Sequence, residues 1–214
     1  MGANLKKKIL LIGGGGHCHS VLDSVFATGI YDDIGIIDSV DCSSFGISVV
    51  GTDEDIPKLY EAGWKYAFIT IGSIGNTVLR RELYNKVKCL GINIPSIIDP
   101  SAVVARGTDI SEGVYVGKKA IINTGSKIGP CAIINSGAIV EHDCVIGQFS
   151  HISPGTTICG QVSVGDDSHV GAGTVVRQLI RIGENAIIGA GSVVVKNIPK
   201  NVTAYGNPCK VVAL

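Results

Sequence analysis

From residue 98 onward, Ile or Val recurs at every sixth position without an insertion, from Ile98 to Val194. The residue four positions after each aliphatic is usually small, as at Ala102, Ala120 and Ser126, and Gly often follows the aliphatic directly. A period of six fits neither the 3.6-residue helix nor a tandem array of helices, whereas it suits a short strand followed by a tight corner. The pattern therefore predicts a parallel β-helix whose aliphatic side chains point inward.

The residues before this series lack the period and alternate between strand-like and helix-like segments. We expect strands over 8–12, 34–37 and 66–71 and helices over 20–28 and 77–88. This alternation favours a parallel sheet covered by helices, and fewer than a hundred residues hold one mononucleotide-binding half of a Rossmann-like fold. With a boundary between Pro95 and Pro100, the chain is predicted to join an α/β domain (1–97) to an all-β domain (98–214).

A glycine-rich loop over residues 13–17 lies between the first expected strand and its helix. Backbone amides and the helix dipole at such a place are suited to phosphate oxygens. Cys18 stands where the dinucleotide fingerprint has its last Gly, so the signal for NAD is weak. Asp38 and Gly72 end the next two strands at the same sheet edge, which favours a ligand over a tight turn beside a surface carboxylate.

Three histidines fall within the repeats, at positions 142, 151 and 169. Three hexapeptides make a coil of eighteen residues, so His151 and His169 are expected to stack one strand spacing apart. His142 lies nine residues from His151, which is half a coil, so the two face away from each other in one chain. If both serve one site, neighbouring subunits must share it, and a closed oligomer becomes a requirement of the mechanism.

His142 is placed at a corner, two residues after Val140, and is flanked by Glu141 and Asp143. Either carboxylate is able to bind one imidazole nitrogen and leave the other as a proton acceptor, as in a general base. The alternative interpretation is that His142 is a solvent-exposed corner residue without a catalytic role. A zinc hydratase site would need three converging imidazoles, and no histidine lies five residues from His151 or His169. We therefore expect no metal.

Composition is consistent with a compact cytoplasmic enzyme. The chain has 214 residues, 45% hydrophobic and 17% charged, and a formal net charge of +0, so no electrostatic signal for nucleic acid or an anionic membrane is present. Seven cysteines without a CxxC pair indicate reduced thiols. The apolar run after the first lysines is too short to span a membrane or to serve as a secretion signal.

Three segments together resemble a known family. Residues 139–153, the loop over 13–17 and the ending over 206–211 are similar to bacterial sugar acetyltransferases of the sialic acid O-acetyltransferase and UDP-4-amino-sugar N-acetyltransferase group, whose usual ending has Ala in place of Cys209. The resemblance spans nearly the whole chain. It implies a left-handed β-helix, against the handedness favoured for parallel crossovers, and a homotrimer that binds acetyl-CoA between adjacent prisms.

The resemblance also implies roles for particular residues. His142 would deprotonate the sugar amine or hydroxyl, and Asp143 would raise its basicity. His151 would contact the acetyl thioester, while Ala172 and Ala190 would bind the pantetheine arm through backbone groups. The nucleotide part of a nucleotide sugar would be held by Gly15, Gly16, His17, Asp38, Ser39 and Gly72. Cys144 occupies an inward repeat position, so we do not expect it to carry an acyl group.

The acceptor implied by this group is one of several sugars. A glycine loop followed by Asp38 suits a nucleotide, which favours N-acetylation of a UDP-linked 4-amino-4,6-dideoxy sugar. A GDP-linked counterpart and O-acetylation of free sialic acid stay open. A trimer that binds nucleotide sugars without catalysis is the non-enzymatic alternative.

Overall fold

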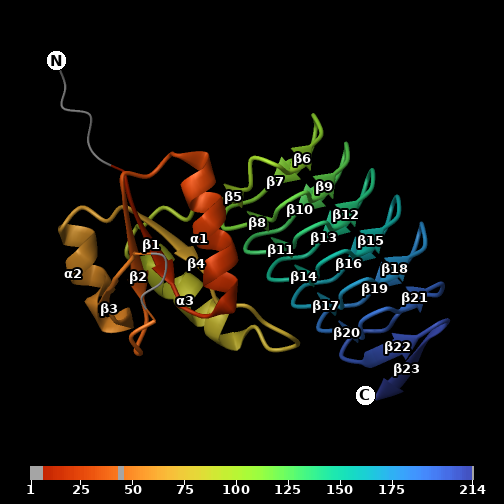
Figure 1. The fold of residues 1–214 in the computed structure, drawn as a ribbon. Coiled ribbons are helices and arrows are strands. Elements are labelled where there is room, and N and C mark those ends of the chain that lie inside the picture. The colour runs from red at the N-terminus through yellow and green to blue at the C-terminus, as the bar shows by residue number, and fades with distance from the viewer. Residues whose placement is uncertain (1–6, 43–45, 214) are drawn as a thin grey trace. The chain divides into compact units, whose positions relative to one another are not determined.

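A computed structural model describes residues 7–42 and 46–213 (Figure 1). The described chain packs into two compact units, each of which is considered by itself. The first contains the residues up to Gly72 together with Val78–Ile97, and the second contains Ser73–Thr77 and the residues from Ile98 onward. The short segment Ser73–Thr77 thus groups with the repeats, although it precedes them in the sequence. No helix in the described ranges is long and apolar enough to cross a bilayer.

The first unit is a four-stranded parallel sheet with helices between its strands. Its strands are β1 (Lys8–Ile12), β2 (Asp33–Ile37), β3 (Val49–Gly51) and β4 (Tyr66–Ile69). Its helices are α1 (Gly16–Thr28), the 3-10 helix η1 (Asp53–Asp55), α2 (Ile56–Glu61) and α3 (Val78–Cys89). Helix α1 begins four residues before the expected start, because an extended Gly15 at its N-cap lets Gly16 enter the first turn, where a helix tolerates glycine.

The order of this sheet, β3-β2-β1-β4, determines where its functional edge lies. β1 pairs with β2 on one side and with β4 on the other, so the winding reverses between β1 and β4. Side chains from alternate positions of β1, such as Leu10 and Ile12, form a core with Leu83 and Val87 of α3. In such sheets, ligands bind in the crevice outside the carboxyl ends of the strands at the reversal.

The second unit contains a parallel β-helix, here called the prism, which begins at Ile98 and has three walls, built of two-residue strands except for the last two strands of wall 1 (Figure 1). Wall 1 contains β5 (Ile97–Ile98), β8 (Tyr115–Val116), β11 (Ile133–Ile134), β14 (His151–Ile152), β17 (His169–Val170), β20 (Ile187–Ile188), β22 (Thr203–Gly206) and β23 (Cys209–Ala213). Wall 2 contains β6 (Val103–Val104), β9 (Ile121–Ile122), β12 (Ile139–Val140), β15 (Thr157–Ile158), β18 (Val175–Val176) and β21 (Val193–Val194). Wall 3 contains β7 (Asp109–Ile110), β10 (Lys127–Ile128), β13 (Val145–Ile146), β16 (Ser163–Val164) and β19 (Arg181–Ile182).

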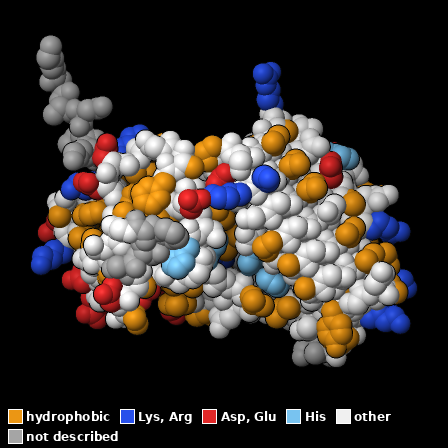
Figure 2. Space-filling view, in the orientation of Figure 1, with side chains coloured by type: hydrophobic (Ala, Val, Ile, Leu, Met, Phe, Trp, Pro, Cys, Tyr) orange, Lys and Arg blue, Asp and Glu red, His pale blue; other side chains and the backbone are white. Residues whose placement is uncertain are grey.

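From β6 to β21, each strand of the prism pairs with the strand one coil away, so that residue i meets residue i+18. The pairing of β20 with β22 is offset, because Ile187 lies opposite Thr203. Val140 pairs with Ile158, and Ile146 pairs with Val164. The second residue of each strand points inward, and from Val116 to Val194 these side chains form one buried core. The first residue points outward, and Figure 2 shows hydrophobic side chains spaced over the visible surface of the prism.

The small residues between the strands close the corners. Ser126, Ser150 and Ser168 are buried, and each hydroxyl donates a hydrogen bond of 2.7 Å to a backbone carbonyl fifteen residues ahead. A larger side chain would not fit, and an unpaired hydroxyl at such a depth would be costly. The C-terminal end of the prism is closed by the antiparallel pair β22 and β23, which the hexapeptide period does not predict.

The inward and outward positions of one strand provide a test of this packing. Ile146 is 1% exposed, whereas its neighbour Val145 is 46% exposed. We expect Ile146→Ala to lower the free energy of unfolding by about 2–5 kcal/mol, because it leaves a cavity in the core. The matched change Val145→Ala should cost less than about 1 kcal/mol. Urea unfolding of both variants measures the difference, and equal losses would contradict the inward assignment.

Candidate active site

A cleft of about 570 Å³ lies at the carboxyl edge of the sheet in the first unit. Asp38 and Ser39, two residues expected to bind a nucleotide, line it. The other lining residues are Ile12, Gly13, Ile37, Thr52, Asp53, Glu54, Ile71, Leu79 and Leu83. The cleft therefore spans the ends of β1, β2 and β4, where the sheet order reverses. The contributions of Thr52, Asp53 and Glu54 were not anticipated, because β3 and η1 were not predicted.

Asp38 organises the glycine loop. Its carboxylate accepts hydrogen bonds from the backbone amides of Gly14 at 2.8 Å and Val40 at 3.0 Å. These amides, Gly14 first, lower the pKa of Asp38 from its ordinary value. A Cβ at Gly14 would overlap the Sγ of Cys42, so a larger residue there would require Cys42 to move. The aspartate thus holds the loop in place, in addition to any contact with a ligand.

The remaining residues expected at the nucleotide lie where α1 begins and β4 has ended. Gly15 is the N-cap of α1, and Gly16 is its first residue; a Cβ at either would meet open space. A Cβ at Gly72 would lie 3.6 Å from the Cβ of His17, so the ends of β1 and β4 are close together. These four residues are not among those that line the cleft.

In the second unit, His142 and Asp143 lie together at the corner between walls 2 and 3, here called corner 2–3. His142 Nδ1 is 2.9 Å from Asp143 Oδ2, and both side chains are about half exposed. A carboxylate only accepts, so in the neutral ring the proton lies on Nδ1 and the lone pair on Nε2. Within the described chain, no hydrogen bond occupies Nε2. Of the two expected carboxylate partners, Glu141 instead accepts a hydrogen bond from Asn123.

His151 and His169 form the expected stacked pair on wall 1. They are register partners, and their ring centroids are 5.0 Å apart with planes at 79°. Both nitrogens of His151 are engaged: Nδ1 donates to the carbonyl of Ser73, and Nε2 accepts from Nδ2 of Asn135, each at 3.1 Å. The amide of Asn135 is oriented because its Oδ1 accepts from Ser136. Asn135 and Ser73 were missed by the sequence analysis.

Ala172 and Ala190 lie one coil apart at the corner between walls 1 and 2, here called corner 1–2. Both are exposed, and each precedes a glycine with a positive φ, Gly173 or Gly191. The carbonyl of Ala172 accepts from Gly191, whereas neither alanine amide donates to another described residue. These amides are therefore available to a ligand. Corner 1–2 and corner 2–3 are the two edges of wall 2, so the alanines and His142 lie at opposite edges of one wall.

Cys144 is buried and points inward, as expected. Burial raises the pKa of its thiol to about 11, and its Sγ lies 3.2 Å from the carbonyl of Cys159. A thiol in this state is a poor nucleophile. Within the described residues, no group of three or more His, Cys, Asp or Glu side chains is arranged to hold a metal ion.

Three family models match parts of the chain. Residues 8–87 match the model of the PglD N-terminal domain, residues 143–178 match the bacterial transferase hexapeptide (six repeats), and residues 179–196 match the hexapeptide repeat of succinyl-transferase. A comparison with curated protein sequences gave no match.

Several solved structures are similar over the whole chain. PerB from Caulobacter crescentus, in complex with CoA and GDP-perosamine, is 39% identical, with a TM-score of 0.91 over 96% of this chain and 97% of that one. The acetyltransferase domain of PglB from Neisseria gonorrhoeae, in complex with acetyl coenzyme A, is 33% identical, with a TM-score of 0.91 over 97% and 100%. WeeI from Acinetobacter baumannii is 26% identical, with a TM-score of 0.88 over 96% and 100%.

The chain belongs to this family of hexapeptide-repeat sugar acetyltransferases. The family resemblance inferred from the sequence is therefore confirmed. The expected fold class, a Rossmann-like α/β unit followed by a left-handed parallel β-helix, is confirmed as well. Another solved structure of the Caulobacter perosamine N-acetyltransferase carries Asn in place of one histidine and also holds CoA and GDP-perosamine.

The carboxylate of Asp38 makes the stability of the first unit depend on pH. Because its pKa is lowered on folding, its charge stabilises the fold above the ordinary carboxyl pKa of about 4, and this contribution is lost as the pH falls through the lower folded value. We expect Asp38→Asn to reduce the free energy of unfolding by about 1 kcal/mol at pH 7 and by less in acid. Urea unfolding between pH 7 and pH 3 measures this, with the exposed Glu61→Gln as control. A difference that stays constant with pH would refute the role of the charge.

Proposed function

We propose that the protein transfers the acetyl group of acetyl-CoA to the amine of a nucleotide-linked amino sugar, with His142 as general base. The observation that carries this proposal is the exposed His142–Asp143 pair, whose Nε2 is left available. The 39% identity to PerB, solved with CoA and GDP-perosamine, supports the choice of both substrates.

The chemistry requires the transfer of a single proton. The amine nitrogen attacks the thioester carbonyl carbon, and Nε2 of His142 takes the proton that the amine loses as the N–C bond forms. The C–S bond then breaks, and the proton passes to the departing sulfur, which leaves an amide and the CoA thiol. Asp143 stabilises the imidazolium while it carries the proton. The buried Cys144 takes no part, so the transfer is direct.

The cleft in the first unit is the proposed nucleotide site. Asp38 and Ser39 would meet the ribose, and the amides of Gly15, Gly16 and His17 at the start of α1 would meet the diphosphate, with Gly72 beside them. Asp53 and Glu54 add carboxylates to the cleft. Carboxylates complement guanine, which presents adjacent N–H donors, better than uracil, whose single N–H lies between two carbonyls. We therefore favour a GDP-linked sugar over the UDP-linked one expected from the sequence.

The outer face of wall 2 is the proposed contact between subunits. Its outward residues are apolar except for Thr157: Val103, Ile121, Ile139, Val175 and Val193. Wall 3 instead presents charged side chains, Asp109, Lys127 and Arg181. An apolar face of this kind is expected to pack against a second copy of the chain. In a closed trimer, wall 2 of every subunit is buried in a contact with a neighbour. This packing would bring corner 2–3 of one subunit beside corner 1–2 of the next, so that acetyl-CoA bound along Ala172 and Ala190 reaches His142 and His151.

Removing the base tests the proposed function. We expect His142→Ala to lower kcat by about 10²- to 10⁴-fold, because the amine then lacks a proton acceptor, while binding of CoA is kept. Release of CoA thiol from acetyl-CoA measures turnover, with GDP-linked and UDP-linked amino sugars and free sialic acid as acceptors.

Cys144→Ala is the matched control for this experiment, since it changes a neighbouring residue that the proposed reaction does not use. It should leave the rate within about twofold of the unmodified enzyme. Undiminished turnover in His142→Ala would refute the base assignment, and release of thiol with none of the amino sugars would refute the acceptor class.

A charge placed on wall 2 tests the proposed trimer. Val175 lies on the outer face of wall 2 and Val145 on that of wall 3, and their exposed fractions are 42% and 46%. We expect Val175→Glu to dissociate the oligomer, because three carboxylates would be buried at the contact, whereas Val145→Glu should leave its mass unchanged. Sedimentation of both variants measures the mass. Dissociation by Val145→Glu alone would contradict the assignment of the contact to wall 2.

A further inference from the structure

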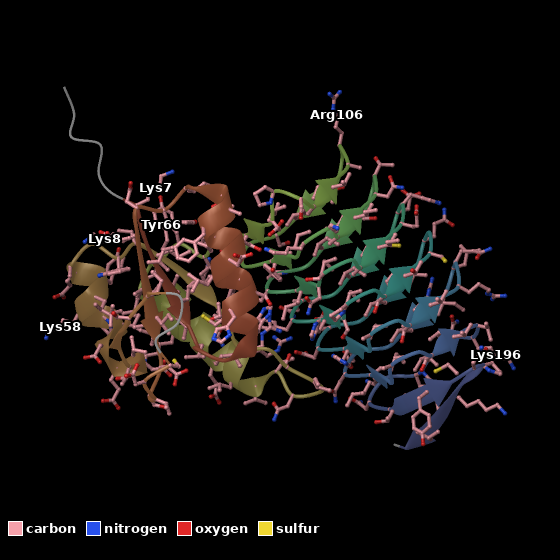
Figure 3. All side chains as sticks on the ribbon, viewed as in Figure 1. Lys7, Lys8, Lys58, Tyr66, Arg106 and Lys196 are labelled. Atoms are coloured by element: carbon pink, nitrogen blue, oxygen red, sulfur yellow. The ribbon has the colours of Figure 1, made fainter. Side chains whose placement is uncertain are left out.

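We propose that Gly160 is a positioning residue for the reaction, because the absence of a side chain there creates the space in which the imidazole of His142 lies. This inference rests on the proposed role of His142 as the base. Six residues occupy equivalent places on corner 2–3 at intervals of eighteen: Arg106, Thr124, His142, Gly160, Gln178 and Lys196. Figure 3 labels the first and last of them, which lie at opposite ends of the prism.

The backbone at this place does not require glycine. Gly160 is not among the glycines with a positive φ, unlike Gly125 and Gly155 at other turns. Thr124, two coils before Gly160, and Gln178, one coil after it, carry full side chains at the equivalent places. The backbone conformation therefore does not explain why residue 160 is glycine. The explanation must lie in the atoms that surround this position.

The spatial reason is the ring of His142. A Cβ built on Gly160 would lie 2.5 Å from Nε2, 2.7 Å from Cε1 and 3.0 Å from Cδ2 of His142. Its three nearest neighbours are thus all atoms of one imidazole. Gly165 and Gly183 differ, because a Cβ there would meet the backbone of the next coil, which is a packing requirement of the prism. At Gly160, the nearest obstacle to a side chain is instead the His142 imidazole.

The ring is constrained on its other side as well. Nδ1 is held 2.9 Å from Asp143, and the Asp143 carboxylate is itself accommodated by Gly125, where a Cβ would overlap Oδ1. Glycines one coil before and one coil after therefore leave room for the two members of the pair. An imidazole pushed away from residue 160 must give up either its alignment with Asp143 or the position of Nε2.

This arrangement predicts a specific kinetic defect in Gly160→Ala. Displacing a reacting group by about 1 Å costs up to about 100-fold in rate, so we expect kcat to fall about 10- to 100-fold. The KM values for acetyl-CoA and for the sugar should change less than about threefold, because the substrate contacts are kept. Gln178→Ala, one coil further along the same corner, is the matched control and should stay within about twofold of the unmodified enzyme.

A double variant separates positioning from general damage. Because the three atoms nearest the added methyl group all belong to the imidazole, Gly160→Ala should cause no further loss of residual turnover or of Tm in the His142→Ala background. Should Gly160→Ala alone fold poorly, the double variant should recover the Tm of His142→Ala.

Three results would overturn the inference: full turnover in Gly160→Ala, an equal rise in KM without a loss of kcat, or an additive loss in the double variant. The same series distinguishes failure of this inference from failure of the proposed function. If His142→Ala retains full turnover, the base assignment itself is wrong. If His142→Ala is inactive while Gly160→Ala is fully active, only the positioning role of Gly160 is wrong.

Discussion

The pairing of each residue with the one eighteen positions later is the constraint on which this molecule depends. It aligns Ile133, His151, His169 and Ile187 on consecutive strands of wall 1 and places their successors, such as Ile152 and Val170, in the core. An insertion of one residue would turn every later side chain to the opposite side of its wall. This requirement explains why no insertion interrupts the series from Ile98 to Val194.

The same constraint determines which side chains can act together. His151 and His169 lie on successive strands and contact each other, whereas His142 is half a coil from His151. Ala172 and Ala190 lie at the edge of wall 2 opposite His142. In the proposed trimer, the missing half of each site comes from the neighbouring subunit. The coil also explains how the His142–Asp143 pair is accommodated, since Gly125 and Gly160 lie one coil away from its members.

Elements with a strong repeating sequence pattern were predicted correctly, and elements without one were missed. The prism was predictable because its period recurs, and the stacking of His151 on His169 followed from counting. The three-residue β3, the six-residue α2 and the hairpin of β22 and β23 were missed, because each is too short to show a periodicity. The choice of Asp143 over Glu141 as partner of His142 depended on the φ of +58° at Asp143 and on the competing hydrogen bond from Asn123, neither of which a sequence displays. Contacts between distant segments, such as Ser73 with His151, were likewise invisible.

Mixed oligomers show whether each proposed site combines corner 2–3 of one subunit with corner 1–2 of its neighbour. One inactive variant carries His142→Ala, and the other carries Ala172→Trp, which would block the proposed acetyl-CoA path. Random mixing in a cyclic trimer pairs an intact His142 with a neighbour's intact Ala172 at about one site in four. If the sites are shared in this way, co-expressed variants recover about a quarter of full activity. Activity that stays at the level of the separate variants would contradict it.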